Sequence, residues 1–176
     1  MLKKILIVLL IAIAGVLGYA ATKPDTFRVE RRTTIAAPPE QIFEMIDDFH
    51  RWRDWSPWEE LDPGMTRTFG GPARGIGATY AWSGNRDVGQ GRMEITESAA
   101  PGKLMIKLDF IAPFEAHNTA EFTLTPKPDG TTEVVWVMDG PSPYITKVMD
   151  TVMNMDKMIG KDFEAGLAKM KAAAER

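Results

Sequence analysis

The sequence predicts an α+β fold in which a long amphipathic helix near the C-terminus covers one face of an antiparallel β-sheet. Residues 142–174 repeat apolar side chains at helical spacing. Residues 65–139 contain six short segments that alternate apolar and polar side chains, separated by glycine, proline and aspartate turns. Such alternation predicts one wet and one covered sheet face, and the terminal helix is the only uncommitted element long enough to cover it.

The composition fits one folded domain with an appendage. The chain has 176 residues, 44% of them hydrophobic, which is enough to build a core. It has no cysteine, which excludes disulfide bonds, a thiol nucleophile and a thiolate zinc site. The formal net charge of -3 argues against nucleic-acid binding, because phosphate recognition needs a cationic surface.

Residues 1–21 are predicted to enter a membrane. Lys3 and Lys4 precede a run of 17 uncharged residues, Ile5 to Ala21, which is short for a transmembrane helix and slightly long for a cleaved signal sequence. An uncleaved single-pass anchor is favoured, and cleavage after the small residues at the end of the run is the alternative (Gly18, Ala20, Ala21). Because the lysines favour a cytoplasmic N-terminus, both alternatives predict an extracytoplasmic domain, anchored to the inner or cytoplasmic membrane or released from it.

Residues 22–26 read as a linker, since Pro24 cannot continue a helix, and residues 27–176 as the domain. Phe27 to Ile35 is rich in β-branched residues and predicts the first strand. Two short helices are expected next, the first starting after Pro38-Pro39 and ending near Phe49. The following stretch holds Trp52, Trp55 and Trp58, which either plug the core with their N–H groups bonded to carbonyls or place one ring against a ligand.

Six further strands are expected, at 65–69, 78–83, 91–98, 103–110, 116–125 and 132–139. Alternation assigns one set of side chains to the covered face: Tyr80, Trp82, Met93, Ile95, Leu104, Ile106, Leu108, Phe110, Ala120, Phe122, Leu124, Val134, Trp136 and Met138. The wet face carries Arg92, Glu94, Lys107, Asp109, Glu121 and Glu133. The glycine-rich residues 70–77 resemble a phosphate loop in composition, but they connect two strands instead of leading into a helix, so a turn is expected.

The terminal helix is predicted to run unbroken from Ser142, as N-cap, to Ala174. Its apolar face carries Ile145, Val148, Met149, Val152, Met155, Ile159, Phe163, Leu167 and Met170. Gly160 and Gly166 are expected to be points of close approach to the sheet, because each costs about 1 kcal/mol of helix propensity relative to alanine.

Asp156 falls in the middle of that apolar face, where a carboxylate needs a hydrogen-bond donor. The expected donors are Trp136, Trp82, Tyr80, Arg92 or Arg67. Two roles stay open for Asp156: pinning the helix to the sheet, or orienting or protonating a polar group of a ligand. His117 is either an ordinary strand-end residue or a second polar group at a cavity mouth. The two histidines and the serines form no metal or nucleophile motif, so no metal or cofactor is expected.

The element order and several motifs resemble the helix-grip superfamily of START-related lipid-transfer domains and polyketide cyclases or dehydrases, called SRPBCC, and within it a bacterial, membrane-anchored branch. The motifs are residues 52–58, 69–85, 136–140 and 155–167. The resemblance implies a curved, seven-stranded antiparallel sheet wrapped around the C-terminal helix. It also implies a hydrophobic cavity between sheet and helix. In a bacterial protein, the extracytoplasmic location predicted above from the N-terminal segment is the periplasm.

The predicted lining of that cavity is Trp55, Tyr80, Trp82, Met93, Ile95, Leu108, Phe110, Phe122, Trp136, Met138, Met149, Val152, Asp156, Ile159 and Phe163. The leading hypothesis is binding of a lipid or other hydrophobic small molecule. The alternative is a cyclase or dehydrase in which Asp156 or His117 does acid/base work. A third hypothesis is a tethered protein-interaction module with a solid core, which cavity volume would distinguish from the other two.

Overall fold

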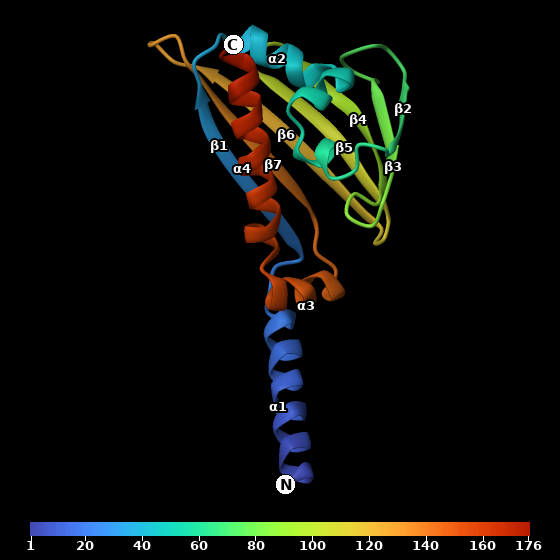
Figure 1. Ribbon diagram of the computed structural model, residues 1–176. Coiled ribbons are helices and arrows are strands. Elements are labelled where there is room, and N and C mark those ends of the chain that lie inside the picture. The colour runs from blue at the N-terminus through green and yellow to red at the C-terminus, as the bar shows by residue number, and fades with distance from the viewer.

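The computed structural model describes residues 1–176 and has an α+β architecture in which an open, curved sheet is covered on one face by helices (Figure 1). The helices are α1 (Leu2–Ala21), α2 (Pro39–Asp47), α3 (Tyr144–Met153) and α4 (Met155–Ala174), with 3-10 turns η1 (Phe49–Asp54) and η2 (Pro57–Glu60) after α2. The strands are β1 (Thr26–Ile35), β2 (Thr66–Gly70), β3 (Thr79–Ser83), β4 (Gln90–Ala99), β5 (Lys103–Ala112), β6 (Ala116–Pro126) and β7 (Thr132–Pro141).

The sheet has seven antiparallel strands in the order β1-β7-β6-β5-β4-β3-β2. Each strand from β2 to β7 pairs with the next one along the chain. β1 pairs with β7 at one edge, and the chain then crosses to β2 at the other edge. Each observed strand lies within two residues of its predicted range. The glycine-rich connection is a turn between β2 and β3, as expected. There Gly71 has a φ of 71°, and a Cβ at this position would overlap the carbonyl of Gly77.

Figure 1 shows α1 projecting from one end of the domain, with α3 lying crosswise between α1 and the sheet. We call this the anchor-proximal end of the sheet, after the membrane anchor that the sequence predicts for α1; β1 begins there at Thr26, and β7 ends there at Pro141. α1 is long and apolar enough to cross a membrane. At the opposite, anchor-distal end, α2 and η1 cover the sheet, and α4 ends beside them.

The prediction of one unbroken helix from Ser142 to Ala174 is wrong. The chain breaks at Asn154, which adopts the left-handed conformation (φ 50°, ψ 77°) and ends α3. The Asn154 side chain also accepts a hydrogen bond from the Lys157 amide at 3.0 Å and so caps α4. Asparagine tolerates the left-handed region and is a preferred N-cap, so this residue suits both tasks. Ser142 caps neither helix; α3 starts after Pro143 without a side-chain cap.

The core lies between α4, α2, η1 and the concave face of the sheet. The predicted inward side chains of β4 to β7 are buried there, with Phe110 half-buried, and the glycines of α4 make the predicted close approaches. A Cβ at Gly166 would lie 2.9 Å from the Trp136 ring, and one at Gly160 would overlap the guanidinium of Arg31. α4 therefore sits closer to the sheet than a helix with side chains at these two positions could.

Candidate functional site

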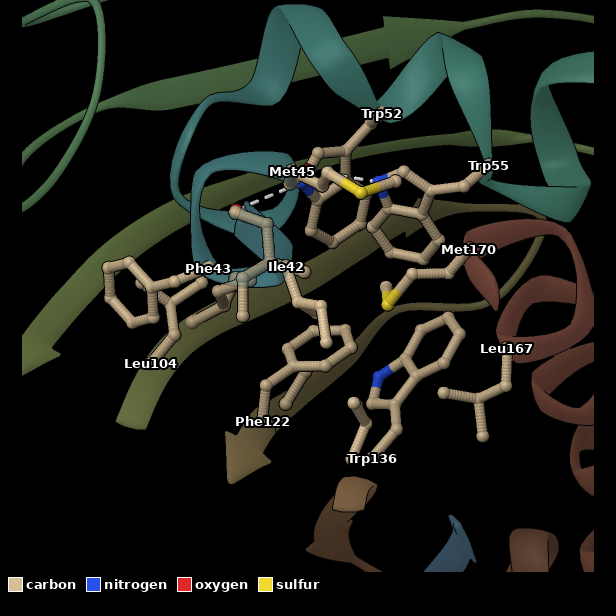
Figure 2. Close-up of a cluster of buried hydrophobic side chains, with 14 of the residues drawn as sticks. Ile42, Phe43, Met45, Trp52, Trp55, Leu104, Phe122, Trp136, Leu167 and Met170 are labelled. Atoms are coloured by element: carbon tan, nitrogen blue, oxygen red, sulfur yellow. Dashed lines mark hydrogen bonds between the residues drawn. The ribbon is translucent and has the colours of Figure 1, made fainter. Parts of the chain in front are cut away.

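The anchor-distal half of the space between sheet and helices is filled by aromatic side chains. Trp136 lies between two rings, stacked on Phe163 with a centroid distance of 4.0 Å and on Phe122 at 4.9 Å. Trp55 meets both Phe122 and Trp136 edge-on. Figure 2 shows the same cluster closed by Leu167 and Met170 from α4. In this half, the space expected to be a cavity is occupied by the protein's own side chains.

The tryptophans of η1 are structural. The indole N–H of Trp52 donates to the carbonyl of Ile46 at 3.0 Å, and that of Trp55 donates to Met45 at 3.0 Å (Figure 2). Both rings are buried. These bonds satisfy the indoles and fix η1 to the end of α2, which corresponds to the first of the two roles that the sequence left open for these tryptophans.

Aromatic rings in the anchor-proximal half are less covered. Trp82 and Phe110 face the same side of the sheet as the core and meet edge-on at 5.9 Å, and both are half-buried. Trp58 of η2 is also half-buried and stands edge-on to Trp136 at 5.8 Å and to Phe163 at 6.3 Å. Trp58 therefore lies at the boundary between the filled half and the less covered half.

Two buried polar atoms on this face have no hydrogen-bond partner: Asn118 Oδ1 and Trp136 Nε1. Asn118 belongs to β6 and lies over Gly140 of β7, where a Cβ would overlap its Oδ1. Trp136 belongs to β7. A buried donor or acceptor without a partner costs about 1–3 kcal/mol, so a native fold that retains two of them calls for an explanation. Together they offer one acceptor and one donor toward the interior.

The residues predicted to line a cavity fall into three groups. Most are fully buried and pack against one another: Trp55, Tyr80, Met93, Ile95, Leu108, Phe122, Trp136, Met138 and Phe163. Four are half-buried: Trp82, Phe110, Met149 and Ile159. Val152 and Asp156 are exposed, at 72% of the residue for Val152 and 59% of the side chain for Asp156, so their predicted inward orientation is wrong. The break at Asn154 explains both errors, because it separates the apolar stripe of α3 from that of α4.

Asp156 pairs with Arg31 of β1, and none of its expected donors reaches it. The Arg31 guanidinium donates to both carboxylate oxygens of Asp156 at 3.2 Å and to Glu164 at 2.7 Å. These bonds raise the pKa of Arg31, with the Asp156 bond as the largest cause. Arg31 lies two residues from Val29 and Thr33 in β1, so its side chain points to the same face of the sheet as theirs, toward the helix.

Two of the expected donors instead serve a carboxylate in η2. Tyr80 donates its hydroxyl to Glu59 at 2.8 Å, and Arg67 donates to the other oxygen of Glu59 at 2.8 Å. Burial, followed by the bond to Glu59, raises the pKa of Tyr80. The Arg67 and Glu59 side chains are both nearly inaccessible. This group ties η2, and with it Trp58, to β2 and β3.

His117 lies on the convex face, away from the helices. Its Nδ1 is 2.7 Å from Asp109, a buried carboxylate that also pairs with Arg92 at 3.0 Å. The bond to Asp109 raises the pKa of His117, and the bond to His117 in turn lowers the pKa of Asp109. Asp156 and His117 thus lie on different surfaces, and the two candidate acid/base groups do not converge on one point.

Of the hollows at the surface, one lies at the start of α4 and a second lies at the β2–β3 turn. The first, of about 190 Å³, is lined by the linker, β1, α3 and the start of α4, and its lining includes Lys23, Asp150 and the predicted site residue Asp156. The other, of about 280 Å³, lies at the β2–β3 turn beside His50, which stacks on Phe69 at 4.1 Å.

Comparison with solved structures finds the same fold in proteins of low sequence identity. The Aha1 dimer from Colwellia psychrerythraea matches with a TM-score of 0.61 at 16% identity, covering 85% of this chain and 96% of that one. A Chromobacterium violaceum protein matches at 0.59 and 16%, covering 87% and 99%. The di-domain aromatase/cyclase StfQ of the steffimycin pathway matches at 0.63 and 14%, covering 85% of this chain and 51% of that one.

No curated protein matches this chain in sequence. The family model described as polyketide cyclase / dehydrase and lipid transport matches residues 26–175, which is the whole sheet together with α2, α3 and α4. The predicted helix-grip fold is confirmed, and the chain belongs to the polyketide cyclase / dehydrase and lipid transport family.

Proposed function

We propose that the domain binds one elongated hydrophobic molecule that carries a polar group, of the lipid class, against the concave face of the sheet. The observation that carries the proposal is the pair of unpartnered buried atoms, Asn118 Oδ1 and Trp136 Nε1. A hydroxyl or carboxyl group can satisfy either atom, which a purely apolar molecule cannot. The family's lipid-transport members give the proposal its ligand class.

The positions of the two atoms favour an elongated ligand. Asn118 lies over Gly140, four residues along β7 from Trp136, and four residues of a strand span about 13 Å. The less covered aromatic rings, Trp82, Phe110 and Trp58, lie on the same side of the sheet. In this proposal they contact the apolar body of the ligand, and Trp58 moves aside to let the ligand reach Trp136. Burial of apolar ligand surface supplies about 25 cal/mol per Å² of affinity.

The proposal includes an uncleaved α1 anchor that holds the domain at the extracytoplasmic, periplasmic face of the membrane. Ala20, within the stretch that a signal peptidase would cut, is completely buried, and the helix continues through Ala21. Lys23 pairs with Asp150 of α3 just beyond it. These contacts support a helix end built into the fold. The intact mass of the membrane-extracted protein tests this part, since cleavage would remove α1.

The test of binding is native mass spectrometry of the full chain, with solvent extraction of the same sample. The expected result is one copurifying molecule per chain, with a long apolar body and a hydroxyl or carboxyl group. Purification in two different detergents separates a resident molecule, whose mass stays the same, from bound detergent. A chain that carries no molecule in either detergent contradicts the proposal.

A second candidate function is a tethered interaction module, and the filled anchor-distal half of the interior favours it. The stacks between Trp136, Phe163 and Phe122 fill this half with the protein's own side chains. In that case the same spectra contain only the ligand-free chain, and replacing Asn118 changes stability without changing any bound mass.

A further inference from the structure

The exposed face of α3 is apolar and its buried face is charged. At 100° per residue, all six apolar side chains of α3 fall within one half of the helix circumference, and the polar ones fall in the other half. Tyr144, Ile145, Val152 and Met153 on the apolar half are exposed, with Val152 at 72%. Lys147 on the polar half is buried, with an exposure of 8%. This is the reverse of the orientation expected for a helix that faces water.

Both charged groups of α3 are neutralised by the segment that follows α1. Lys147 pairs with Asp25, and Asp150 pairs with Lys23. Asp150 also accepts the amide of Met155 at 2.8 Å and so fixes the turn into α4. The polar half of α3 is therefore satisfied within the protein, and the outward half carries no charge that would have to be removed from water.

The depth of α3 follows from its contact with α1. The Tyr144 hydroxyl donates to the carbonyl of Leu17 at 2.9 Å. Leu17 lies four residues before the end of α1, which is about 6 Å along the helix axis. If α1 spans the membrane as proposed above, Tyr144 lies at the level where apolar chains meet headgroups, which tyrosine side chains favour.

We propose that α3 is an interfacial membrane helix whose apolar half, defined by Tyr144, Ile145, Val148, Met149, Val152 and Met153, inserts into the outer leaflet beside α1. The occupant of this face is lipid. The inference rests on the anchor role proposed for α1, and α1 supplies the continuity: α3 contacts the end of the same helix that would cross the bilayer (Figure 1). With two attachments the domain has a fixed orientation, and the anchor-proximal half of its concave face lies next to the membrane surface.

Site-directed spin labelling tests this directly, because the chain has no cysteine of its own. Three single-cysteine variants of the full chain carry the nitroxide: Leu9→Cys within α1, Val152→Cys on the apolar half of α3, and Lys161→Cys on an exposed position of α4. Each is reconstituted in vesicles of phosphatidylcholine and phosphatidylglycerol in equal parts. Collisional relaxation is measured with oxygen, which concentrates in lipid, and with a water-soluble nickel chelate.

The expected result is strong relaxation by oxygen and loss of relaxation by nickel at residues 9 and 152, with the opposite pattern at residue 161. Lipid exposure at residue 9 combined with nickel access at residue 152 overturns the role of α3 while leaving the anchor intact. Low access of both reagents at residue 152 also overturns it, because a protein surface then covers the face. Nickel access at both residues 9 and 152 contradicts the anchor and the α3 proposal together.

Discussion

The guanidinium of Arg31 occupies the space that a side chain at residue 160 would fill. Gly160 of α4 therefore lets the helix lie directly over β1, and Arg31 reaches across it to Asp156 and Glu164. α4 is thus attached to the sheet by a charged contact at Asp156 and Glu164, and by the buried side chains of Phe163, Leu167 and Met170.

Replacing Gly160 should have opposite effects depending on residue 31. Gly160→Ala should lower the free energy of unfolding, because its Cβ overlaps the guanidinium and Arg31 must move. In an Arg31→Ala background the same change should raise it by up to about 1 kcal/mol, the helix propensity of alanine over glycine. Urea unfolding of the four proteins measures both effects. A loss of equal size in both backgrounds would show that Arg31 is not the obstacle.

Asp156→Asn should leave ligand content unchanged. The carboxylate is exposed and pairs with an arginine that keeps Glu164 as a second partner, so the expected loss in unfolding free energy is about 1 kcal/mol or less. Native mass spectrometry and urea unfolding of the variant check the two statements. A large loss of bound molecule with normal stability would restore a direct role for Asp156.

Phe163→Ala should be among the most destabilising single changes in α4. The ring is buried and stacked on Trp136 with an interplanar angle of 5°, and truncating a buried phenylalanine costs about 3–5 kcal/mol. Glu164 is the next residue and its side chain is exposed, so Glu164→Ala is the matched control. It should lower the free energy of unfolding by about 1 kcal/mol or less. Similar losses for the two variants would mean that the Phe163 side of α4 is not packed against the sheet as described.

The contact between His117 and Asp109 should make stability depend on pH. Because folding raises the pKa of His117, its contribution is complete below the unfolded value of 6.5 and is lost as pH rises through the folded pKa. The stability difference between wild type and His117→Gln should therefore shrink as the pH rises above the unfolded value of 6.5. Asp109→Asn should remove most of that pH dependence, because the bond to Asp109 is the largest cause of the raised pKa and Glu115, 3.3 Å from the other ring nitrogen, remains as a weaker partner. A difference that stays constant over this range contradicts the assignment.

The sheet could be predicted from the sequence because strand alternation depends only on which face is covered. The same rule also supports two assignments that were missed. Arg31 lies two residues from Val29 in β1, and Asn118 lies two residues from Ala120 in β6. Both therefore share the inward face of these apolar residues although they are polar. Gly160 and Gly166 were predicted correctly as close approaches, because glycine in a helix interior is costly unless something needs the space.

The error at the terminal helix has one physical cause. A stripe of apolar residues at helical spacing extends from Ile145 to Met170, and the break at Asn154 rotates its two parts relative to each other. Asn154 carries the local signal, a preferred N-cap followed by an acidic residue in the first turn. In the proposal that α3 inserts beside α1, its apolar half does not need to face the sheet, and the information for this lies in α1 rather than in α3 itself.

The central claim, that the concave face holds a hydrophobic molecule through its unpaired polar atoms, is tested most directly by Asn118→Leu. Leucine has the same branched shape and removes a buried acceptor that has no partner, so the free chain should become more stable by up to about 1–3 kcal/mol, less the cost of fitting its larger side chain over Gly140. Native mass spectrometry of wild type and variant, purified side by side, should show the copurifying molecule in the wild type and its loss in the more stable variant. An equal amount of bound molecule in both proteins, or none in either, would contradict the account.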